Sequence, residues 1–238
     1  MENVSKYQER ASNLTAQEII PWALKTFDVS RVALASSFSI EDQVITDMLV
    51  QADSQSRIFT LDTGRHFQET YDVWQQSVDF WNISYEVAAP DPLELAELMN
   101  IKGPNLFYQS IEARKLCCAV RKTHPLEKVL KTVDAWIVGL REEQSVTRVG
   151  LQPVEWDDAH GIYRISPLYN WSESKTLEYI RNRKLPINAL YEKGFRSIGC
   201  APCTRAISPN DDVRAGRWWW EEPEHKECGL HNRKLKIN

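Results

Sequence analysis

The 238-residue sequence has no long apolar run. No stretch approaches the roughly 20 consecutive apolar residues of a membrane-spanning helix. The N-terminal segment has scattered apolar positions and lacks the continuous apolar centre of a signal peptide. A formal net charge of −4 also argues against nucleic-acid binding through an overall basic surface. We therefore expect a cytoplasmic protein with neither a membrane nor a nucleic acid as partner.

Cysteine is scarce, with five residues in the chain. The reducing cytoplasm disfavours disulfides, and an odd number of cysteines fits metal binding or reactive thiols better than a disulfide framework. The sequence shows no internal repeat, low-complexity tract or coiled-coil heptad. The rest of the composition, 42% hydrophobic and 26% charged, is that of an ordinary globular protein. The length allows one sizeable domain or two small ones.

Between residues 16 and 187, apolar segments typical of strands alternate with amphipathic segments typical of helices. This alternation predicts an α/β fold with a mostly parallel sheet and helices on both faces. The expected strands lie at residues 31–38, 57–61, 83–89, 135–139 and 163–168. The expected helices lie at residues 16–27, 41–53, 67–81, 91–100, 108–131 (with a break near Pro125) and 171–184.

Ligands of such folds bind at the carboxyl ends of the strands, where the sequence has candidate turns at residues 36–42, 62–65 and 139–141. Residues 188–238 differ from the rest, being rich in Pro, Gly, Trp and Cys with little periodicity. Such a stretch is either disordered or held by something other than a hydrophobic core. Three consecutive tryptophans argue against disorder. We expect an α/β nucleotide-binding core at 16–187 and a Cys-containing C-terminal segment at 188–238.

Four of the cysteines form two pairs, Cys117–Cys118 and the "CAPC" of Cys200 and Cys203. Adjacent side chains do not face one another on a helix, and a disulfide between neighbours would be strained. Two pairs of thiolates fit a four-iron cluster by count. Zinc normally takes two Cys-x-x-Cys pairs or closely spaced histidines, and neither is present. We favour a cluster, then zinc, then buried free cysteines.

The fifth cysteine, Cys228, lies in "ECGLHN" near the C-terminus. Gly229 permits a close backbone approach, His231 follows two residues later, and a basic "RKLK" comes next. A positive field lowers the pKa of a thiol and favours the nucleophilic thiolate. The sequence therefore predicts a reactive Cys228; the alternative is an ordinary surface cysteine.

Seven motifs resemble those of the phosphoadenylyl/adenylyl-sulfate reductase family, and within it the bacterial adenylyl-sulfate reductases: "SSFSIED", "LDTGRHFQET", "KLCCAVRK", "GLREEQS", "GCAPCTRA", "RAGRWWWE" and "ECGLH". The resemblance runs from about residue 30 to residue 232. It implies a Rossmann-like adenine nucleotide α-hydrolase fold in a single reductase domain. Members with both cysteine pairs hold a 4Fe-4S cluster and act on adenosine 5′-phosphosulfate (APS), whereas members without them use the 3′-phosphorylated form (PAPS). The resemblance thus implies Cys117, Cys118, Cys200 and Cys203 as ligands and Cys228 as nucleophile.

The activity implied is reduction of APS to sulfite and AMP through an S-sulfocysteine, with thioredoxin as reductant, in sulfate assimilation for cysteine biosynthesis. Family members are commonly homo-oligomers. An anionic substrate needs cations, and arginine suits bidentate binding of phosphate or sulfate, while lysine acts as a point charge. We expect His231 beside Cys228 in catalysis. The expected substrate-binding residues are Ser37, Ser39, Asp62, Thr63, Gly64, Lys122, Gly139, Arg141, Arg214 and Arg217. We expect the cluster to order its surroundings and tune the local field without cycling through redox states.

Other functions stay open at this point. Related ATP pyrophosphatases have a glycine-rich "SGGxDS" loop, and the corresponding "SFSIED" here has no glycine, which favours a reductase over ATP cleavage. The alternatives are a PAPS or dual-specificity reductase, an ATP pyrophosphatase-type enzyme with a structural metal, and a non-enzymatic iron–sulfur or zinc module.

Overall fold

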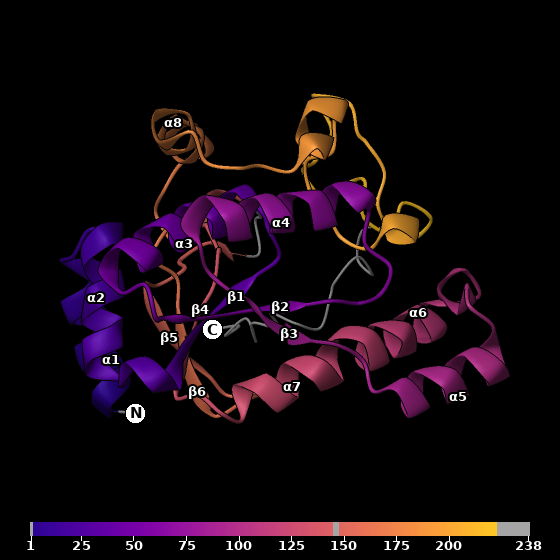
Figure 1. The fold of residues 1–238 in the computed structure, drawn as a ribbon, viewed down its shortest axis with the longest axis horizontal. Helices are drawn as coiled ribbons and strands as arrows, with labels where there is room; N and C mark the ends of the chain where they lie inside the picture. The colour runs from indigo at the N-terminus through magenta and orange to yellow at the C-terminus, as the bar shows by residue number, and fades with distance from the viewer. Residues whose placement is uncertain (1, 145–147, 223–238) are drawn as a thin grey trace. The chain divides into compact units, whose positions relative to one another are not determined.

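The computed structural model describes residues 2–144 and 148–222. Its centre is a six-stranded sheet in the order β3-β2-β1-β4-β6-β5 (Figure 1). β1 pairs in parallel with β2 and β4, β4 pairs in parallel with β6, and the edge strand β5 pairs antiparallel with β6. The predicted mostly parallel α/β sheet is confirmed. The strands are β1 Val32–Ser36, β2 Arg57–Leu61, β3 Glu86–Ala88, β4 Ala135–Ile137, β5 Val154–Asp157 and β6 Ile162–Ile165.

The predicted helices are present, and one more precedes them. The helices are α1 Glu2–Ser12, α2 Ala16–Thr26, α3 Ile40–Ala52, α4 Gln68–Trp81, α5 Pro92–Lys102, α6 Ile111–Cys118, α7 His124–Leu130 and α8 Glu173–Arg183. The sequence analysis did not anticipate α1, which is mostly polar, or β5, which is short and carries two acidic residues. α1 packs on β5, so each depends on a contact distant in sequence.

The chain divides into two compact units. Unit 1 comprises Met1–Thr60, Glu69–Glu86 and Leu130–Ala189. Unit 2 comprises Leu61–Gln68, Val87–Val129 and Leu190–Asn238. None of the helices in the described ranges is both long enough and apolar enough to cross a membrane.

In unit 1, α3 is a buried helix that packs on β1, α2 and α8. Residues 40–49 of this helix are all buried, although several are polar. Buried polar groups need hydrogen-bond partners, and α3 finds them in neighbouring elements. The Gln43 amide donates to the Ser77 hydroxyl on α4 and to the carbonyl of Pro186, both at 2.8 Å. α3 is thereby fixed in position at its N-terminal half.

Asp47 fixes the C-terminal half of α3. Its carboxylate, only 2% exposed, accepts hydrogen bonds from the Trp81 indole at 3.1 Å and the Tyr179 hydroxyl at 2.8 Å. Arg183 Nε of α8 donates to the same carboxylate at 3.0 Å. One buried acceptor therefore joins three helices of unit 1.

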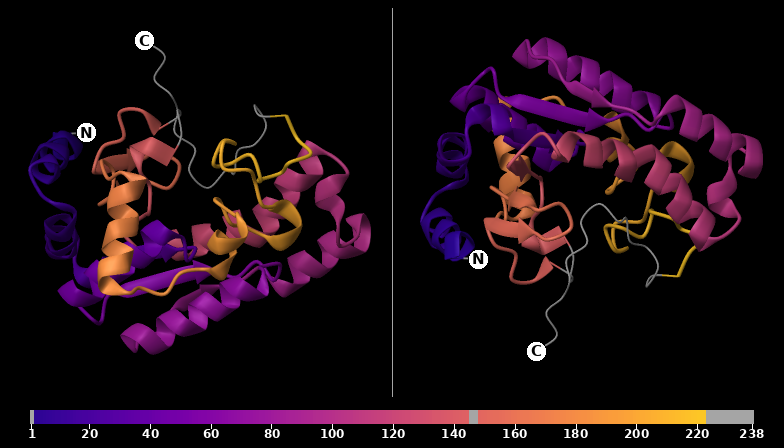
Figure 2. Two further views of the ribbon diagram at one scale, coloured as in Figure 1. Left: turned by 90° about the horizontal axis from the view of Figure 1, so that it is seen from above. Right: turned by 90° about the horizontal axis from the view of Figure 1, so that it is seen from below.

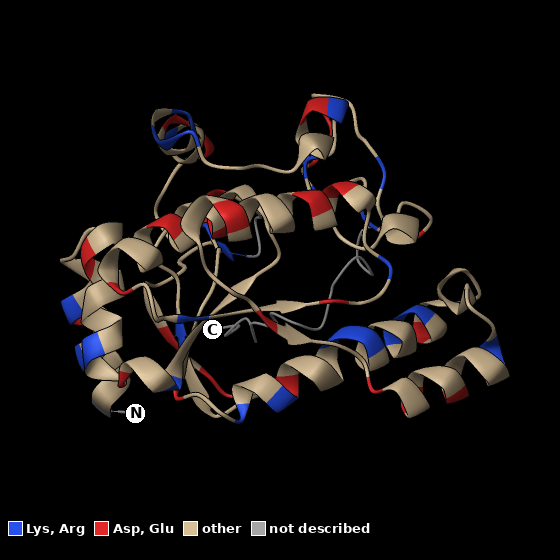
Figure 3. Cartoon of the chain, viewed as in Figure 1, with Lys and Arg blue, Asp and Glu red and all other residues tan. Residues whose placement is uncertain are grey.

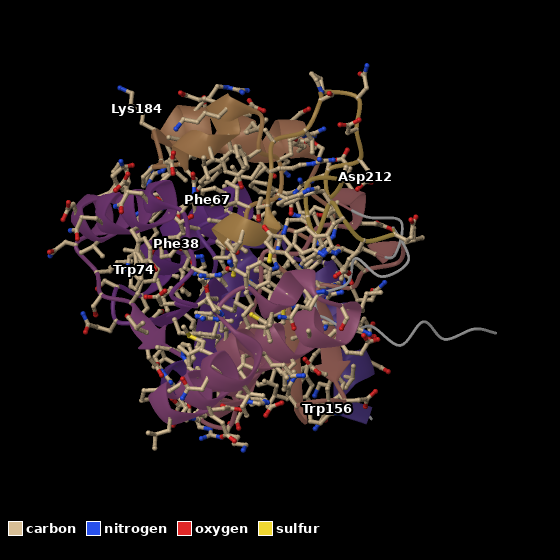
Figure 4. The ribbon with its side chains drawn as sticks, turned by 90° about the vertical axis from the view of Figure 1, so that its right-hand side faces the viewer. Phe38, Phe67, Trp74, Trp156, Lys184 and Asp212 are labelled. Atoms are coloured by element: carbon tan, nitrogen blue, oxygen red, sulfur yellow. The ribbon has the colours of Figure 1, made fainter. Side chains whose placement is uncertain are left out.

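The loop between β1 and α3 is organised by the Asp42 carboxylate. Ser39 caps α3, and Asp42 accepts from the Ser37 backbone N–H at 2.7 Å, the Ser37 hydroxyl at 2.8 Å and the Ser39 N–H at 3.3 Å. Phe38 has a φ of 60°, a left-handed conformation that is uncommon for a bulky residue. Its ring stacks on Trp74 with centroids 5.6 Å apart (Figure 4), and this packing stabilises the turn without a glycine.

In unit 2, α6 continues into α7 through a π-helical turn at Ala119–Thr123 (Figure 2). Pro125 has no backbone N–H, and its ring crowds the carbonyl of Arg121 four residues earlier. The chain adjusts upstream, where the His124 N–H donates to the carbonyl of Ala119. The break expected near Pro125 is therefore a change of helix type, of a kind often found at functional sites.

We predict that Asp47→Ala lowers the free energy of unfolding by about 3 kcal/mol. The half-buried Trp81 and Tyr179 donors would lose their acceptor, at about 1–3 kcal/mol for each unsatisfied group. Arg183→Ala is the control: its side chain is 48% exposed, so its loss should cost less than about 1 kcal/mol. Urea denaturation of both variants checks this, and equal losses would contradict it.

Stability should also depend on the ionisation of Asp42. Burial raises the pKa of this carboxyl from 3.8 to about 6, because it outweighs the hydrogen bonds from Ser37. The protonated form is therefore favoured by folding. Its contribution is complete below about pH 4 and is lost as the pH rises through 6.

We expect Asp42→Asn to gain stability relative to the unchanged protein between pH 4 and pH 7, by on the order of 3 kcal/mol. Denaturation series at both pH values measure this difference. Asp134→Asn is the control: the hydrogen bond from Arg31 lowers the pKa of the exposed Asp134 below 3.8, so its effect on stability should stay nearly constant between pH 4 and pH 7. A difference that does not change with pH would refute the Asp42 prediction.

Candidate active site

In unit 1, the carboxyl ends of β1 and β4 lie where the strand order reverses, which is where ligands of such sheets bind. Gly139 follows β4 and lies against the start of α3. A Cβ at Gly139 would stand 2.5 Å from Asp42 Oδ1 and 2.9 Å from Glu41 Cβ. Only glycine allows this close approach, which explains the residue at this predicted site position.

Arg141 is buried beside the same helix start. Its guanidinium donates to Glu41 at 2.9 Å, to Glu143 at 3.1 Å and to the carbonyl of Trp171 at 3.3 Å. Glu41 is buried, whereas the Glu143 side chain is 58% exposed. Two carboxylates thus compensate the charge of Arg141, and an incoming anion would compete with the exposed one.

Ser37 and Ser39 serve the loop itself. The Ser37 hydroxyl donates to Asp42, and the Ser39 hydroxyl accepts from the Asp42 backbone N–H at 3.2 Å. The backbone donors of both serines also point to the Asp42 carboxylate. In a phosphate-binding loop these donors would face the ligand, so here the carboxylate takes the place of an anion.

In unit 2, the fold brings together four cysteines that are far apart in sequence. Cys117 and Cys118 end α6, and Cys200 and Cys203 bracket the 3₁₀ turn Ala201–Cys203. None of these four cysteines is part of a disulfide. Cys117 and Cys203 are buried in one core cluster with Val120 and other apolar residues, and Cys200 packs against it. The two pairs that the sequence separates by more than eighty residues form one site.

The thiols of this site differ in their environments. Burial raises the pKa of Cys203 to about 12, and the negative charges of Cys200, Cys118 and Cys117 add to the effect. Burial also raises the pKa of Cys117. Burial also tends to raise the pKa of Cys200. The positive charge of Lys122, the hydrogen bond from the Thr63 hydroxyl and the charges of Arg217 and Arg121 together outweigh burial, so the pKa of Cys200 is lowered.

Cations recur along the helices that carry the first cysteine pair. Figure 3 shows Lys and Arg along α6, the π-helical turn and α7. Lys122 follows Cys118 by four residues, as expected for a residue that acts on the thiol site, and its charge reaches Cys200. Arg121 is buried and lowers the pKa of Cys117 against the effect of burial.

The turn at 62–65 lies directly at the second cysteine pair. The Thr63 hydroxyl is 3.3 Å from Cys200 Sγ, and the carbonyl of Thr63 accepts from Arg121 Nη1 at 2.6 Å. The N–H of Ala201 donates to the carbonyl of Arg65 at 2.7 Å. Asp62 Oδ1 accepts from the N–H of Gly64, whose φ of 67° suits glycine. Thr63, which the sequence predicts as a substrate-binding residue, thus lies beside the thiols.

Arg121 was not among the residues predicted for the site. The only signal for it in the sequence is its place in "KLCCAVRK", between the cysteine pair and Lys122. Arg65 was missed in the same way: its guanidinium lies 5.2 Å from the Phe107 ring and acts on Cys117. Arg121 follows Cys117 by four residues, the spacing that places two side chains on the same side of a helix, and this spacing is the signal that could have indicated it.

Arg217, which directly precedes the three tryptophans, acts by its charge on Cys200 and Cys203. It is 8% exposed, its guanidinium carbon lies 4.9 Å from the Trp218 ring, and Nη1 is 3.4 Å from the carbonyl of Ile198. A Cβ at Gly199 would lie 2.3 Å from Arg217 Nη2, so this glycine makes room for the guanidinium. Arg214 lies farther off, 6.0 Å from the same ring.

Trp218 holds this segment against the cysteine loop. Its N–H donates to the carbonyl of Cys203 at 3.1 Å, and Thr204 forms a bridge with Arg217. Trp218 is 1% exposed and has a φ of 41°, a strained conformation for a tryptophan, at a cost of about 1–3 kcal/mol. Strain of this kind collects at functional sites, and here the packing of two guanidiniums on the ring maintains it.

The side chains of unit 2 that could bind a metal are chiefly the four cysteines. Within residues 2–144 and 148–222, no three His, Cys, Asp or Glu side chains are placed as ligands of a single ion. By type and number, the four cysteine thiols are the ligands that a 4Fe-4S cluster takes. In those same ranges Arg217 Nε, Trp218 Nε1 and Arg65 Nε are buried donors without an acceptor. Anionic sulfur near the thiols would give Arg65 and Arg217 one.

The predicted site residues thus fall into two groups. Unit 2 brings Asp62, Thr63, Gly64, Lys122, Arg214 and Arg217 together with the four cysteines, and unit 1 brings Ser37, Ser39, Gly139 and Arg141 to the ends of β1 and β4. Cys228 and His231 lie outside the described residues.

Comparisons with known proteins agree with this arrangement. The phosphoadenosine phosphosulfate reductase domain matches residues 31–206. An adenosine 5′-phosphosulfate reductase of Allochromatium vinosum is 46% identical over 208 residues, which are 87% of this chain and 81% of that protein. One from Burkholderia cepacia is 42% identical over 201 residues, which are 84% of this chain and 80% of that protein.

Solved structures match the same fold. A phosphoadenylyl-sulfate (PAPS) reductase from Candida auris, in a phosphate complex, has a TM-score of 0.75 at 25% identity, covering 87% of this chain and 97% of that one. Yeast FAD synthetase in complex with FAD has a TM-score of 0.58 at 15% identity, covering 84% and 67%, which shows the fold alone. The Rossmann-like adenine nucleotide α-hydrolase fold is confirmed, and the chain belongs to the phosphoadenosine phosphosulfate reductase family.

Proposed function

We propose that this protein is an oxidoreductase of sulfate assimilation that reduces APS to sulfite and AMP in the cytoplasm, with thioredoxin as reductant. The whole chain would act as one reductase domain, and copies of it would form a homo-oligomer. The relatives in Allochromatium vinosum and Burkholderia cepacia carry the name of this activity. The observation that carries the proposal is the gathering of both cysteine pairs in one cationic site of unit 2.

A 4Fe-4S cluster held by Cys117, Cys118, Cys200 and Cys203 is the cofactor that we propose. Four cysteines that form no disulfide, and the unsatisfied buried donors Arg65 Nε and Arg217 Nε, support it. When bound, it would tie α6 to the Ala201–Cys203 turn and supply a fixed negative charge. The surrounding guanidiniums and Lys122 would then be held in place, facing an anionic substrate on their other side.

The reaction that we propose begins at Cys228. Its thiolate attacks the sulfur of APS, the bond from sulfur to the bridging oxygen breaks, and AMP leaves with that oxygen. This leaves an S-sulfocysteine, and His231 would assist the thiolate. A thiolate of reduced thioredoxin then attacks Cys228 Sγ and releases sulfite. The second thiol of thioredoxin resolves the mixed disulfide, so the dithiol supplies both electrons. Covalent catalysis of this type divides one difficult step into easier ones.

The cations would bind the phosphosulfate and stabilise the attack of an anion on an anion. We propose Lys122, Arg214 and Arg217 for this role in unit 2, with Asp62, Thr63 and Gly64 at the nucleotide. Gly139, Ser37, Ser39 and Arg141 are the corresponding proposals in unit 1. Binding through Arg141 requires that the substrate displace Glu143, its exposed partner.

Reduction of PAPS is the second candidate, and the likeness to the Candida auris enzyme favours it. ATP cleavage is less well supported. The backbone donors of Ser37 and Ser39 already bind the Asp42 carboxylate, and Phe38 stands where a phosphate loop has glycine. Sulfite release from APS and from PAPS, measured with thioredoxin on anaerobically purified protein, separates the two reductases.

We predict that protein incubated with APS and no thiol donor gains the mass of one SO3 group on the tryptic peptide that contains Cys228. Cys228→Ser should gain none and release no sulfite, because the attacking sulfur is absent. This variant should keep its iron, which distinguishes loss of the nucleophile from loss of the cofactor. An unmodified Cys228 peptide in active protein would overturn the mechanism.

Arg217→Ala should raise KM for APS by about 10- to 100-fold, since a hydrogen bond to a charged group contributes about 1.5–3 kcal/mol. Arg205→Ala is the matched control: Arg205 lies in the same segment, is exposed, and its guanidinium is 5.6 Å from the Trp219 ring. It should change KM by less than about threefold, corresponding to a surface contact below 1 kcal/mol. Steady-state kinetics of both variants test this, and equal effects would remove Arg217 from the binding site.

A further inference from the structure

A buried ion pair joins α6 to the residue that follows the three tryptophans. Arg114 Nε donates to Glu221 Oε1 at 3.0 Å, and Arg114 Nη2 donates to Glu221 Oε2 at 2.7 Å. The side chains are 1% and 3% exposed. This is the parallel two-bond geometry in which arginine binds a carboxylate most specifically. It fixes the plane of the Arg114 guanidinium.

Arg114 also faces the thiol site. It precedes Cys118 by four residues on α6, so both side chains lie on the same side of the helix. The Arg114 guanidinium interacts with Cys118 by charge and by a side-chain hydrogen bond. On its other side, its central carbon lies 4.6 Å from the Trp218 ring. Arg114 is therefore held by three groups, of which one is a thiol of the proposed cluster site.

Stability alone gives a weak reason for this pair. Removing two charges from water costs several kcal/mol for each, and apolar side chains of similar size commonly stabilise a core as well or better. The alternative reason is local electrostatics. Arg114 places a positive charge beside Cys118, and Glu221 carries the negative charge that offsets it. The pair is neutral as a whole but strongly polar at the thiol.

We propose that Arg114 is a positioning residue that sets the charge environment of the Cys118 side of the cluster site, with Glu221 holding the guanidinium in place and offsetting its charge. The proposal rests on the cluster assigned under the proposed function. Arg114 thus adds to Lys122 and Arg217 a third cation at this site, which acts on the thiols from α6.

The two halves of the pair should therefore act in opposite directions. Glu221→Gln leaves an uncompensated guanidinium beside Cys118, which favours the more negative, reduced state of the cluster and raises its reduction potential. Arg114→Met removes the nearer positive charge and lowers that potential. A structural role predicts instead that both variants lose stability and that neither shifts the potential in a direction set by its charge.

The experiment uses full-length protein purified anaerobically, with iron content measured first. Voltammetry then gives the midpoint potential of whichever one-electron couple of the cluster is reversible, for Glu221→Gln, Arg114→Met and the double variant. Glu155→Gln is the matched control. Its partner is Arg164, in a buried pair at 2.9 Å with side chains 13% and 5% exposed, on the strands β5 and β6 of unit 1.

We expect an upward shift for Glu221→Gln, a downward shift for Arg114→Met, an intermediate value for the double variant and no shift for Glu155→Gln. Shifts of the same sign in both single variants, or none, would overturn the proposal and leave the cluster assignment intact. Unchanged protein that carries no iron but reduces APS would overturn the cluster assignment and, with it, this role of Arg114.

Discussion

Four ionisable thiols confined to one small volume are the constraint on which unit 2 depends. Burial raises the pKa of Cys203 to about 12, with smaller contributions from the neighbouring thiolates. Such a group remains together as anions only where positive charge surrounds it. Lys122, Arg121 and Arg217 supply that charge, and the turn at 62–65 adds the Thr63 hydroxyl. The cations that stabilise the thiols are also those that suit an anionic substrate.

Much of the local structure follows from placing these cations. Pro125 forces the π-helical turn that carries Arg121 and Lys122. Gly199 leaves room for the guanidinium of Arg217, and Trp218 accepts a strained backbone so that its ring lies under arginine side chains. The π-helical turn, the close approach at Gly199 and the strained backbone of Trp218 would each weaken an ordinary core. Here all three occur around the cysteine site, where packing against the arginine side chains compensates them. Unit 1 shows the opposite arrangement, in which carboxylates compensate Arg141.

The sequence predicted most of the fold because its signals are local. Alternating apolar and amphipathic segments indicated five of the six strands, and the capping residues Asp91 and Ser172 mark helix starts that the structure contains. α1 was missed because it is mostly polar, and β5 because it has only four residues, two of them acidic. Their stability comes from packing on one another, which no window of a few residues records.

For the site, the sequence by itself determined the kinds of groups: two cysteine pairs, a late cysteine and the cationic motifs, whose residue types fix what chemistry is available. Only the tertiary structure decided which of these groups act on one another. It placed Thr63 on Cys200, turned Arg121 and Arg114 toward the thiols, and engaged Arg141, Ser37 and Ser39 with carboxylates. The reason is physical: charge and hydrogen bonding depend on distances of a few ångströms, which long-range packing sets and residue order does not.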